Sequence, residues 1–125
     1  MFRMSDRMML SMRVLCVLSR ERDASNSEIA ARLGCSPNTL AKLLQMLSGG
    51  GLVESRRGPG GGSRLTRTLG RISLAGVHEA VHGELPSCCQ LHEEYSSRCP
   101  LCRVARDVRR RMRRTPVCKI RERLR

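Results

Sequence analysis

The chain has 125 residues, which is the size of one domain with a small appendage. It holds one Phe, one Tyr and no Trp, so its core must be built from aliphatic side chains, which suits packed helices. The formal net charge of +13 favours nucleic acid or another anionic surface as the partner. No apolar run approaches the roughly 20 residues of a membrane span, so we expect a cytoplasmic protein without membrane attachment.

The positive charge is concentrated at the C-terminal end. Residues 103–125 carry 11 basic and 2 acidic side chains, whereas the first 102 residues carry a net charge of only +4. An argument for DNA binding must therefore rest on where charges lie in the first part of the chain. The basic tail is equally compatible with a solvated extension.

Three helices are predicted before residue 50. Apolar residues recur at helical spacing over residues 5–20. Ser25 and Glu28 form a capping-box pattern that opens a short second helix, and Gly34 ends it. Ser36 and Pro37 suit the cap and the first turn of a third helix, with Leu40, Leu43, Leu44 and Leu47 on its apolar face.

The second and third helices are joined by a short turn, which is the pattern of a helix-turn-helix. The polar face of the third helix would contact bases or phosphates in the major groove through short polar side chains and one base: Ser36, Asn38, Thr39 and Lys42. Taken alone, the same pattern also fits an ordinary surface helix.

A two-stranded ribbon with a basic, glycine-rich tip is predicted over residues 52–65. Glycines permit sharp turns and close approach to a partner, and arginines beside such a tip suit phosphates or a minor groove. The candidate DNA contacts of this wing are Arg56, Arg57, Gly58, Gly60, Gly61, Gly62 and Arg64.

Beyond the wing, a further helix is predicted from about Leu74 to Val81, followed by an irregular cysteine-rich segment after Pro86. Helical spacing returns between Leu101 and Met112, as a narrow apolar stripe flanked by arginines that suits packing on a single partner. Pro116 ends this helix, and one or two further turns are expected over residues 117–124.

The cysteine-rich segment has metal-ligand spacing. Cys89, His92, Cys99 and Cys102 form two pairs, each with a two-residue gap, and such a set can chelate zinc tetrahedrally. Three cysteines with one further ligand would equally hold an iron–sulfur cluster. A thiol switch and four unliganded thiols remain open. Cys16 and Cys35 are expected to be small core residues.

The combined motifs resemble the Rrf2 family of bacterial transcription regulators over roughly residues 5–83. The resemblance rests on Glu28-Ile29-Ala30, Gly34, Ser36, Leu43, Leu47 and the segment Gly51-Leu52-Val53 through Arg57-Gly58-Pro59-Gly60-Gly61-Gly62 to Leu65. It implies a winged helix-turn-helix that binds a double-stranded DNA operator as a homodimer paired through the long C-terminal helix. It also implies an iron–sulfur cluster, two-iron or four-iron, that senses redox, iron or nitric oxide.

The resemblance implies a ligand set of Cys89, Cys99, Cys102 and Asp6, with Cys88 and His92 as alternatives. Asp6 would come from the other subunit, since Ser5-Asp6 is similar to the Thr-Asp of nitric-oxide-sensing members; it would otherwise only cap the first helix. The cysteine spacing departs from the family, in which about five residues separate successive cysteines. Here nine residues separate Cys89 from Cys99, and two separate Cys99 from Cys102.

The sequence thus predicts a mainly α fold with a small two-stranded β wing. A DNA-binding unit would span residues 1–84, a metal-binding loop 85–102, and a basic dimerisation helix and tail 103–125. No catalytic triad, nucleotide-binding glycine loop or apolar carboxylate pair is present, so neither an enzyme nor a small-molecule substrate is expected. The alternative is a zinc-stabilised or thiol-switch protein without a cluster, including an interaction module whose helix-turn-helix serves protein contacts.

Overall fold

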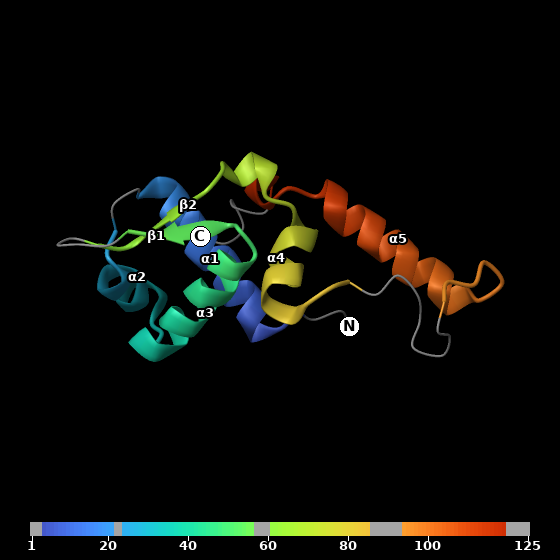
Figure 1. Cartoon of the computed structure of the whole chain (residues 1–125), viewed down its shortest axis with the longest axis horizontal. Helices are drawn as coiled ribbons and strands as arrows, with labels where there is room; N and C mark the ends of the chain where they lie inside the picture. The colour runs from blue at the N-terminus through green and yellow to red at the C-terminus, as the bar shows by residue number, and fades with distance from the viewer. Residues whose placement is uncertain (1–3, 22–23, 57–60, 86–93, 120–125) are drawn as a thin grey trace.

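The computed structural model describes residues 4–21, 24–56, 61–85 and 94–119 (Figure 1). Five α-helices, a two-stranded sheet and two short 3-10 helices make up these parts of the chain. In order they are α1 (Asp6–Arg20), α2 (Asn26–Leu33), α3 (Pro37–Gly49), β1 (Val53–Ser55), β2 (Ser63–Leu65), η1 (Leu69–Arg71), α4 (Leu74–His82), α5 (Pro100–Arg114) and η2 (Val117–Lys119). The mainly α class with a small β wing is therefore confirmed.

The first helix, α1, forms the centre of the core. Ser5 caps it by accepting a hydrogen bond from the backbone N–H of Met8, and Asp6 lies in its first turn. Its apolar side chains at helical spacing are buried, among them Met8, Met12 and Leu15. This face contacts α2, α3, α4 and β2, so one aliphatic cluster joins the helices to the wing.

The helix-turn-helix is built as its capping residues predict. Ser25 and Glu28 form a reciprocal capping box at the start of α2. Gly34 ends α2 with φ +64°, a left-handed conformation that glycine adopts without strain. Ser36 then caps α3, with Pro37 at its first position. The buried leucines of α3 are those predicted: Leu40, Leu43, Leu44 and Leu47.

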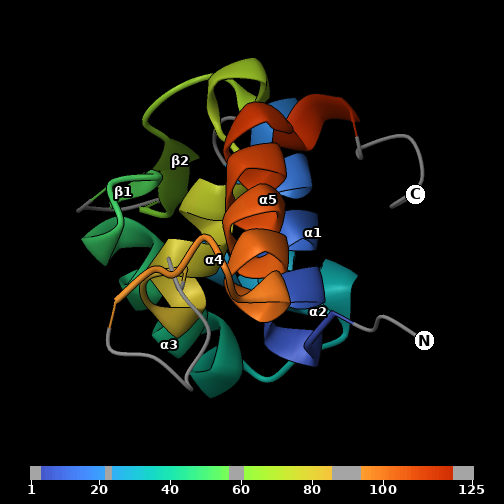
Figure 2. The ribbon, with the colours of Figure 1, turned by 90° about the vertical axis from the view of Figure 1, so that its right-hand side faces the viewer.

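The C-terminal helix α5 is attached to the domain at one end only. Near that end, Leu74 N–H donates to the Thr115 carbonyl and Val117 N–H donates to the Ile72 carbonyl, both at 2.8 Å. The rest of α5 extends along α4 and beyond it, away from the wing (Figures 1 and 2). The predicted break at Pro116 agrees with a helix that ends at Arg114.

Helix α5 begins at Pro100, one residue before the predicted return of helical spacing at Leu101. The reason is that Pro100 suits the first turn of a helix, where its missing N–H costs nothing. The 3-10 turn η1 was not predicted, because three residues carry too little periodicity.

Candidate nucleic-acid interface

The polar face of α3 is exposed. Ser36, Asn38, Thr39 and Lys42 are all exposed, as a recognition helix requires. The Ser36 hydroxyl accepts from Thr39 N–H at 3.1 Å and lies 2.8 Å from the Thr39 hydroxyl. Because these two hydroxyls serve the cap, Asn38 and Lys42 are better placed to reach a ligand beyond the helix.

Sequence reasoning missed Gln45 on this face. Gln45 is exposed and lies three residues after Lys42 and seven after Asn38, so the three side chains share one side of α3. Glutamine can bond an adenine edge with both its amide groups. The spacing of these residues is the signal that would have identified it.

The wing is a short antiparallel ribbon. Val53, Glu54 and Ser55 pair with Leu65, Arg64 and Ser63, and Arg56 N–H extends the ladder to the Gly62 carbonyl at 2.7 Å. Glu54 and Arg64 face each other across the strands and form an ion pair. Their exposure of about half leaves the Arg64 guanidinium open to exchange with another anion.

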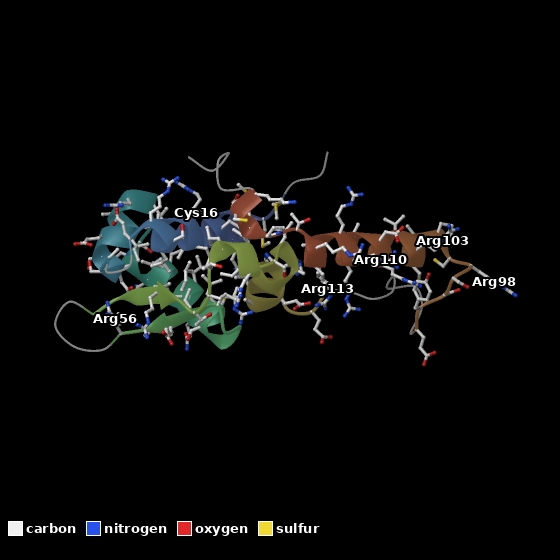
Figure 3. The ribbon with its side chains drawn as sticks, turned by 90° about the horizontal axis from the view of Figure 1, so that it is seen from above. Cys16, Arg56, Arg98, Arg103, Arg110 and Arg113 are labelled. Atoms are coloured by element: carbon white, nitrogen blue, oxygen red, sulfur yellow. The ribbon has the colours of Figure 1, made fainter. Side chains whose placement is uncertain are left out.

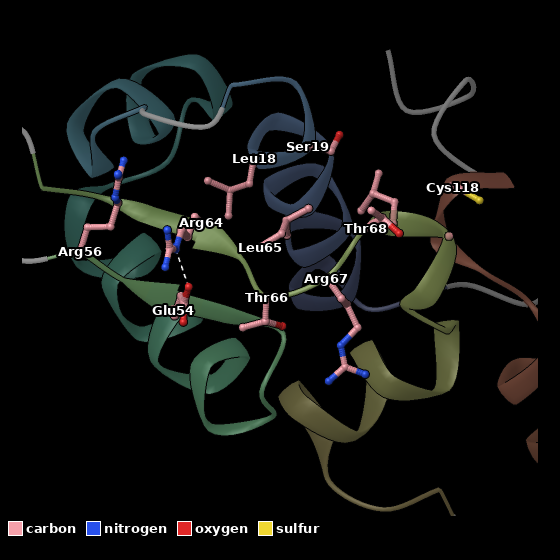
Figure 4. A pocket seen from close by; sticks show the side chains of 12 residues that line it. Leu18, Ser19, Glu54, Arg56, Arg64, Leu65, Thr66, Arg67, Thr68 and Cys118 are labelled. Carbon is pink, nitrogen blue, oxygen red and sulfur yellow. Dashed lines mark hydrogen bonds and ion pairs between the residues drawn. The ribbon is translucent and has the colours of Figure 1, made fainter.

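A groove of about 930 Å³ runs from the wing to the end of α1 (Figure 4). Arg56 and Arg64 line it, and so does Arg67, an exposed base that the sequence analysis did not assign. The Glu54 carboxylate and three hydroxyl groups complete its polar side-chain lining: Ser19, Thr66 and Thr68. Guanidinium and hydroxyl groups in one open groove suit phosphate oxygens.

The wing glycines have different positions. Gly62 is buried, and a Cβ built on it would lie 2.4 Å from the Ala24 carbonyl oxygen. Its missing side chain therefore lets the wing pack against the chain before α2, which corrects its predicted place at the DNA surface. Gly61 is half-buried. The predicted contacts Arg57, Gly58 and Gly60 lie outside the described residues.

Asp6 lies beside α3. A smaller cavity of about 290 Å³ separates the start of α1 from α3, and Asp6, Arg7, Thr39 and Lys42 are among its lining residues. The structure therefore shows Asp6 as a first-turn residue of α1 that shares a cavity with two predicted DNA contacts.

The candidate metal ligands are not brought together within the described part of the chain. Cys99 is the cap residue of α5 and is half-buried, and Cys102, three positions later in the same turn, is fully buried. Cys88, Cys89 and His92 lie outside the described residues. No three His, Cys, Asp or Glu side chains among the described residues are grouped as metal ligands. Cys16 is buried as expected, and Cys35 is partly buried against the core.

A pair of histidines lies where α4 ends near the start of α1. His82 Nε2 is 2.6 Å from the hydroxyl of Ser5, the residue that caps α1. Desolvation lowers the pKa of His82 below its usual 6.5, and the charges of His78 and Arg7 lower it further. These effects favour the neutral form of His82.

No helix in the described parts of the chain has both the length and the apolar character to cross a bilayer.

Comparison with known proteins identifies a family that matches most of the chain and relatives that match parts of it. The Rrf2 family, described as iron-dependent transcriptional regulators, matches residues 4–124. The HTH-type transcriptional regulator IscR of Xenorhabdus nematophila is 37% identical over 97 residues, which cover 75% of this chain and 59% of that protein. Protein aau3 of Rhizobium meliloti is 34% identical over 90 residues, which cover 72% of this chain and 58% of that protein. The chain thus spans less than two thirds of the length of either relative.

Solved structures share the fold. The cysteine regulator CymR of Bacillus subtilis superposes with a TM-score of 0.77 over 98% of both chains, at 22% identity. IscR of T. potens superposes with a TM-score of 0.73 over 99% of this chain and 89% of that one, at 20% identity. The family and the IscR relative are transcriptional regulators, which confirms the prediction of a regulator rather than an enzyme. The helix-turn-helix, the wing and the family match together establish that this chain belongs to the Rrf2 family of transcriptional regulators.

Proposed function

We propose that the chain binds an operator in double-stranded DNA through α3 and the wing. The observation that carries the proposal is that Asn38, Lys42 and Gln45 form one exposed polar face on a capped second helix, directly before a ribbon with exposed arginines. In this arrangement α3 enters the major groove, while Arg56, Arg64 and Arg67 hold phosphates beside the wing. The predicted contacts Arg57, Gly58 and Gly60 at the tip belong to the same proposal.

Selection of bound sequences from a random duplex pool tests this function. The parent is expected to enrich one symmetric motif. Asn38→Ala should then weaken binding to that motif by about 1–3 kcal/mol while leaving binding to random duplex nearly unchanged, because a base contact carries the discrimination. Ser48→Ala, an exposed position near the end of α3, is the matched control. Failure of the pool to yield any motif would refute operator recognition.

An exposed apolar stripe on α5 supports homodimerisation through this helix. Leu101, Val104 and Val108 are 56%, 59% and 44% exposed, and with Met112 they recur at helical spacing along the part of α5 that extends beyond the domain. We assign this apolar stripe to a second copy of the chain, since a twofold protein matches a palindromic operator.

Sensing through a metal centre rests on Cys99 and Cys102. Two thiols in the first turn of α5 supply half of a four-ligand set, and the other candidates are Cys88, Cys89, His92 and the partner subunit's Asp6. A bound iron–sulfur cluster would make cysteine ligation responsive to redox, iron or nitric oxide, and its loss would shift α5. Zinc held by the same residues would instead be a structural clip.

Metal analysis of anaerobically purified protein separates these alternatives. Matched iron and sulfide with visible absorbance supports the cluster, about one zinc per chain supports the clip, and neither metal leaves thiol chemistry as the route to sensing. Cys99→Ala should remove the bound metal, whereas Cys118→Ala, an exposed cysteine in η2, should retain it.

A further inference from the structure

The arginines of α5 form a surface that neither the recognition helix nor the wing uses. α5 contains seven arginines and a single acid, Asp107. Six of these arginines are exposed, and four of the six follow each other at intervals of three, four and four residues; we name these four the arginine stripe: Arg103, Arg106, Arg110 and Arg114. Such intervals keep side chains on one side of a helix, over a length of about 16 Å.

The arginine stripe and the apolar stripe face opposite directions. The apolar stripe has the same intervals but starts two residues earlier, at Leu101, and two residues of an α-helix turn through about 200°. The side between them faces the domain near the C-terminal end of α5, where Arg113 donates to Glu79 of α4 at 2.9 Å. A second copy bound on the apolar stripe would therefore leave the arginine stripe open.

Among the described residues no acid forms an ion pair with the arginine stripe, although Asp107 lies on the same side of α5, four residues after Arg103. The ion pair of α5 there is Arg113 with Glu79, which lies off the stripe. Tyr95 lies under Arg106, with 5.0 Å between the guanidinium carbon and the ring centroid. Arg103 and Arg110 lie along the part of α5 that extends beyond the domain (Figure 3). The stripe is thus a row of accessible guanidinium groups, one of them oriented by an aromatic ring.

We propose that the arginine stripe binds the phosphate backbone of duplex DNA outside the segment read by α3 and the wing. A duplex presents regularly spaced phosphates along each strand, and guanidinium groups at intervals of about 5–6 Å along one helix face match a repeating anion better than a single small ligand. The inference rests on the proposed function in that the ligand is duplex DNA, and it adds a contact that carries no sequence information.

Binding of a random-sequence duplex, measured over a series of salt concentrations, tests the stripe. The test variant is Arg103→Gln with Arg110→Gln. The control is Arg13→Gln with Arg20→Gln, which are also exposed, also seven residues apart on one helix, and remove the same charge. Each phosphate contact contributes about 0.9 to the steepness of log affinity plotted against log salt concentration. Loss of two contacts in the stripe variant should therefore reduce this steepness by about 1.8 per protomer, whereas the control should keep the parent's value. Sedimentation in the same buffers measures the assembly state of each variant, so that a change in slope is not confused with a change in oligomeric state.

Selectivity distinguishes this proposal from operator recognition. The ratio of motif affinity to random-duplex affinity should be the same in the parent and the stripe variant, because phosphate contacts weaken all sequences alike. If the salt dependence falls equally in the stripe variant and the control, the effect comes from net charge alone, and the proposal is overturned. An unchanged slope in the stripe variant, with binding to vesicles of anionic lipid in the parent alone, would assign the stripe to a membrane surface instead. If no motif is selected, operator recognition fails while the comparison of slopes still decides the stripe.

Discussion

Glu54 and Arg64 are direct neighbours across the two strands of the wing, and their side chains form an ion pair beside the basic groove. The pair gives Arg64 two states. In the unbound protein the guanidinium is held by the carboxylate, and in a complex it would exchange this partner for a phosphate. Glu54 would thus compete with DNA for Arg64, a predicted DNA contact.

Glu54→Gln should therefore strengthen DNA binding. The substitution releases Arg64 and removes a negative charge from the groove, so the salt dependence should steepen by about one phosphate contact, or about 0.9 in the slope. Titration of a labelled duplex at several salt concentrations measures this. Glu84→Gln, which removes an exposed carboxylate far from the wing in sequence, provides the control. Identical slopes for the two variants would mean that Arg64 does not exchange partners.

Gly62→Ala should loosen the wing. The added Cβ would lie 2.4 Å from the Ala24 carbonyl oxygen, so the backbone must shift, and overpacking of this kind costs about 1–3 kcal/mol. A lower midpoint of thermal or urea unfolding checks the effect. Gly49→Ala is the matched control, because a Cβ there meets nothing within 4 Å. A variant at residue 62 that is as stable as the control would rule out the close contact with Ala24.

Val104→Ser should weaken self-association without unfolding the domain. Val104 is 59% exposed, so the domain itself gains little from this side chain, whereas a second copy would bury it. Sedimentation over a range of protein concentrations should show more monomer, with unchanged helical circular dichroism. Ala31→Ser, an exposed apolar position on α2, serves as the control. If both variants associate like the parent, the interface between copies lies elsewhere.

The desolvation of His82 and its proximity to His78 and Arg7 should make stability fall in acid. The pKa of His82 in the fold is below 6.5, so the unfolded chain binds the extra proton first as pH falls. Stability from this group is complete above pH 6.5 and is lost as pH falls through the lower pKa of the folded state. His82→Gln keeps a hydrogen-bonding group next to Ser5 but does not titrate. Its unfolding midpoint should therefore depend less on pH in this window than that of the parent, and equal pH dependence would contradict the assignment.

The sequence alone determined where the helices begin and end, because the interactions that start and stop a helix are local. Ser25 with Glu28, Gly34, and Ser36 with Pro37 act through bonds within a few residues, and each occupies the predicted position in the structure. Helical spacing of leucines in α3 likewise predicted which side chains are buried. The wing was predictable for the same reason, since arginines and glycines between two apolar runs are typical of a β-ribbon with a tight turn.

Only the tertiary structure decided which of these residues remain available to a partner. The sequence does not show that Gly62 packs on Ala24, that Glu54 holds Arg64, or that Arg67 joins the same groove, because each depends on segments brought together by folding. The sequence does predict that the two stripes on α5 face opposite directions, because they are offset by two residues of a helix. Only the ion pair of Arg113 with Glu79 shows that the side between them faces α4, since packing between distant helices leaves no local pattern in the chain.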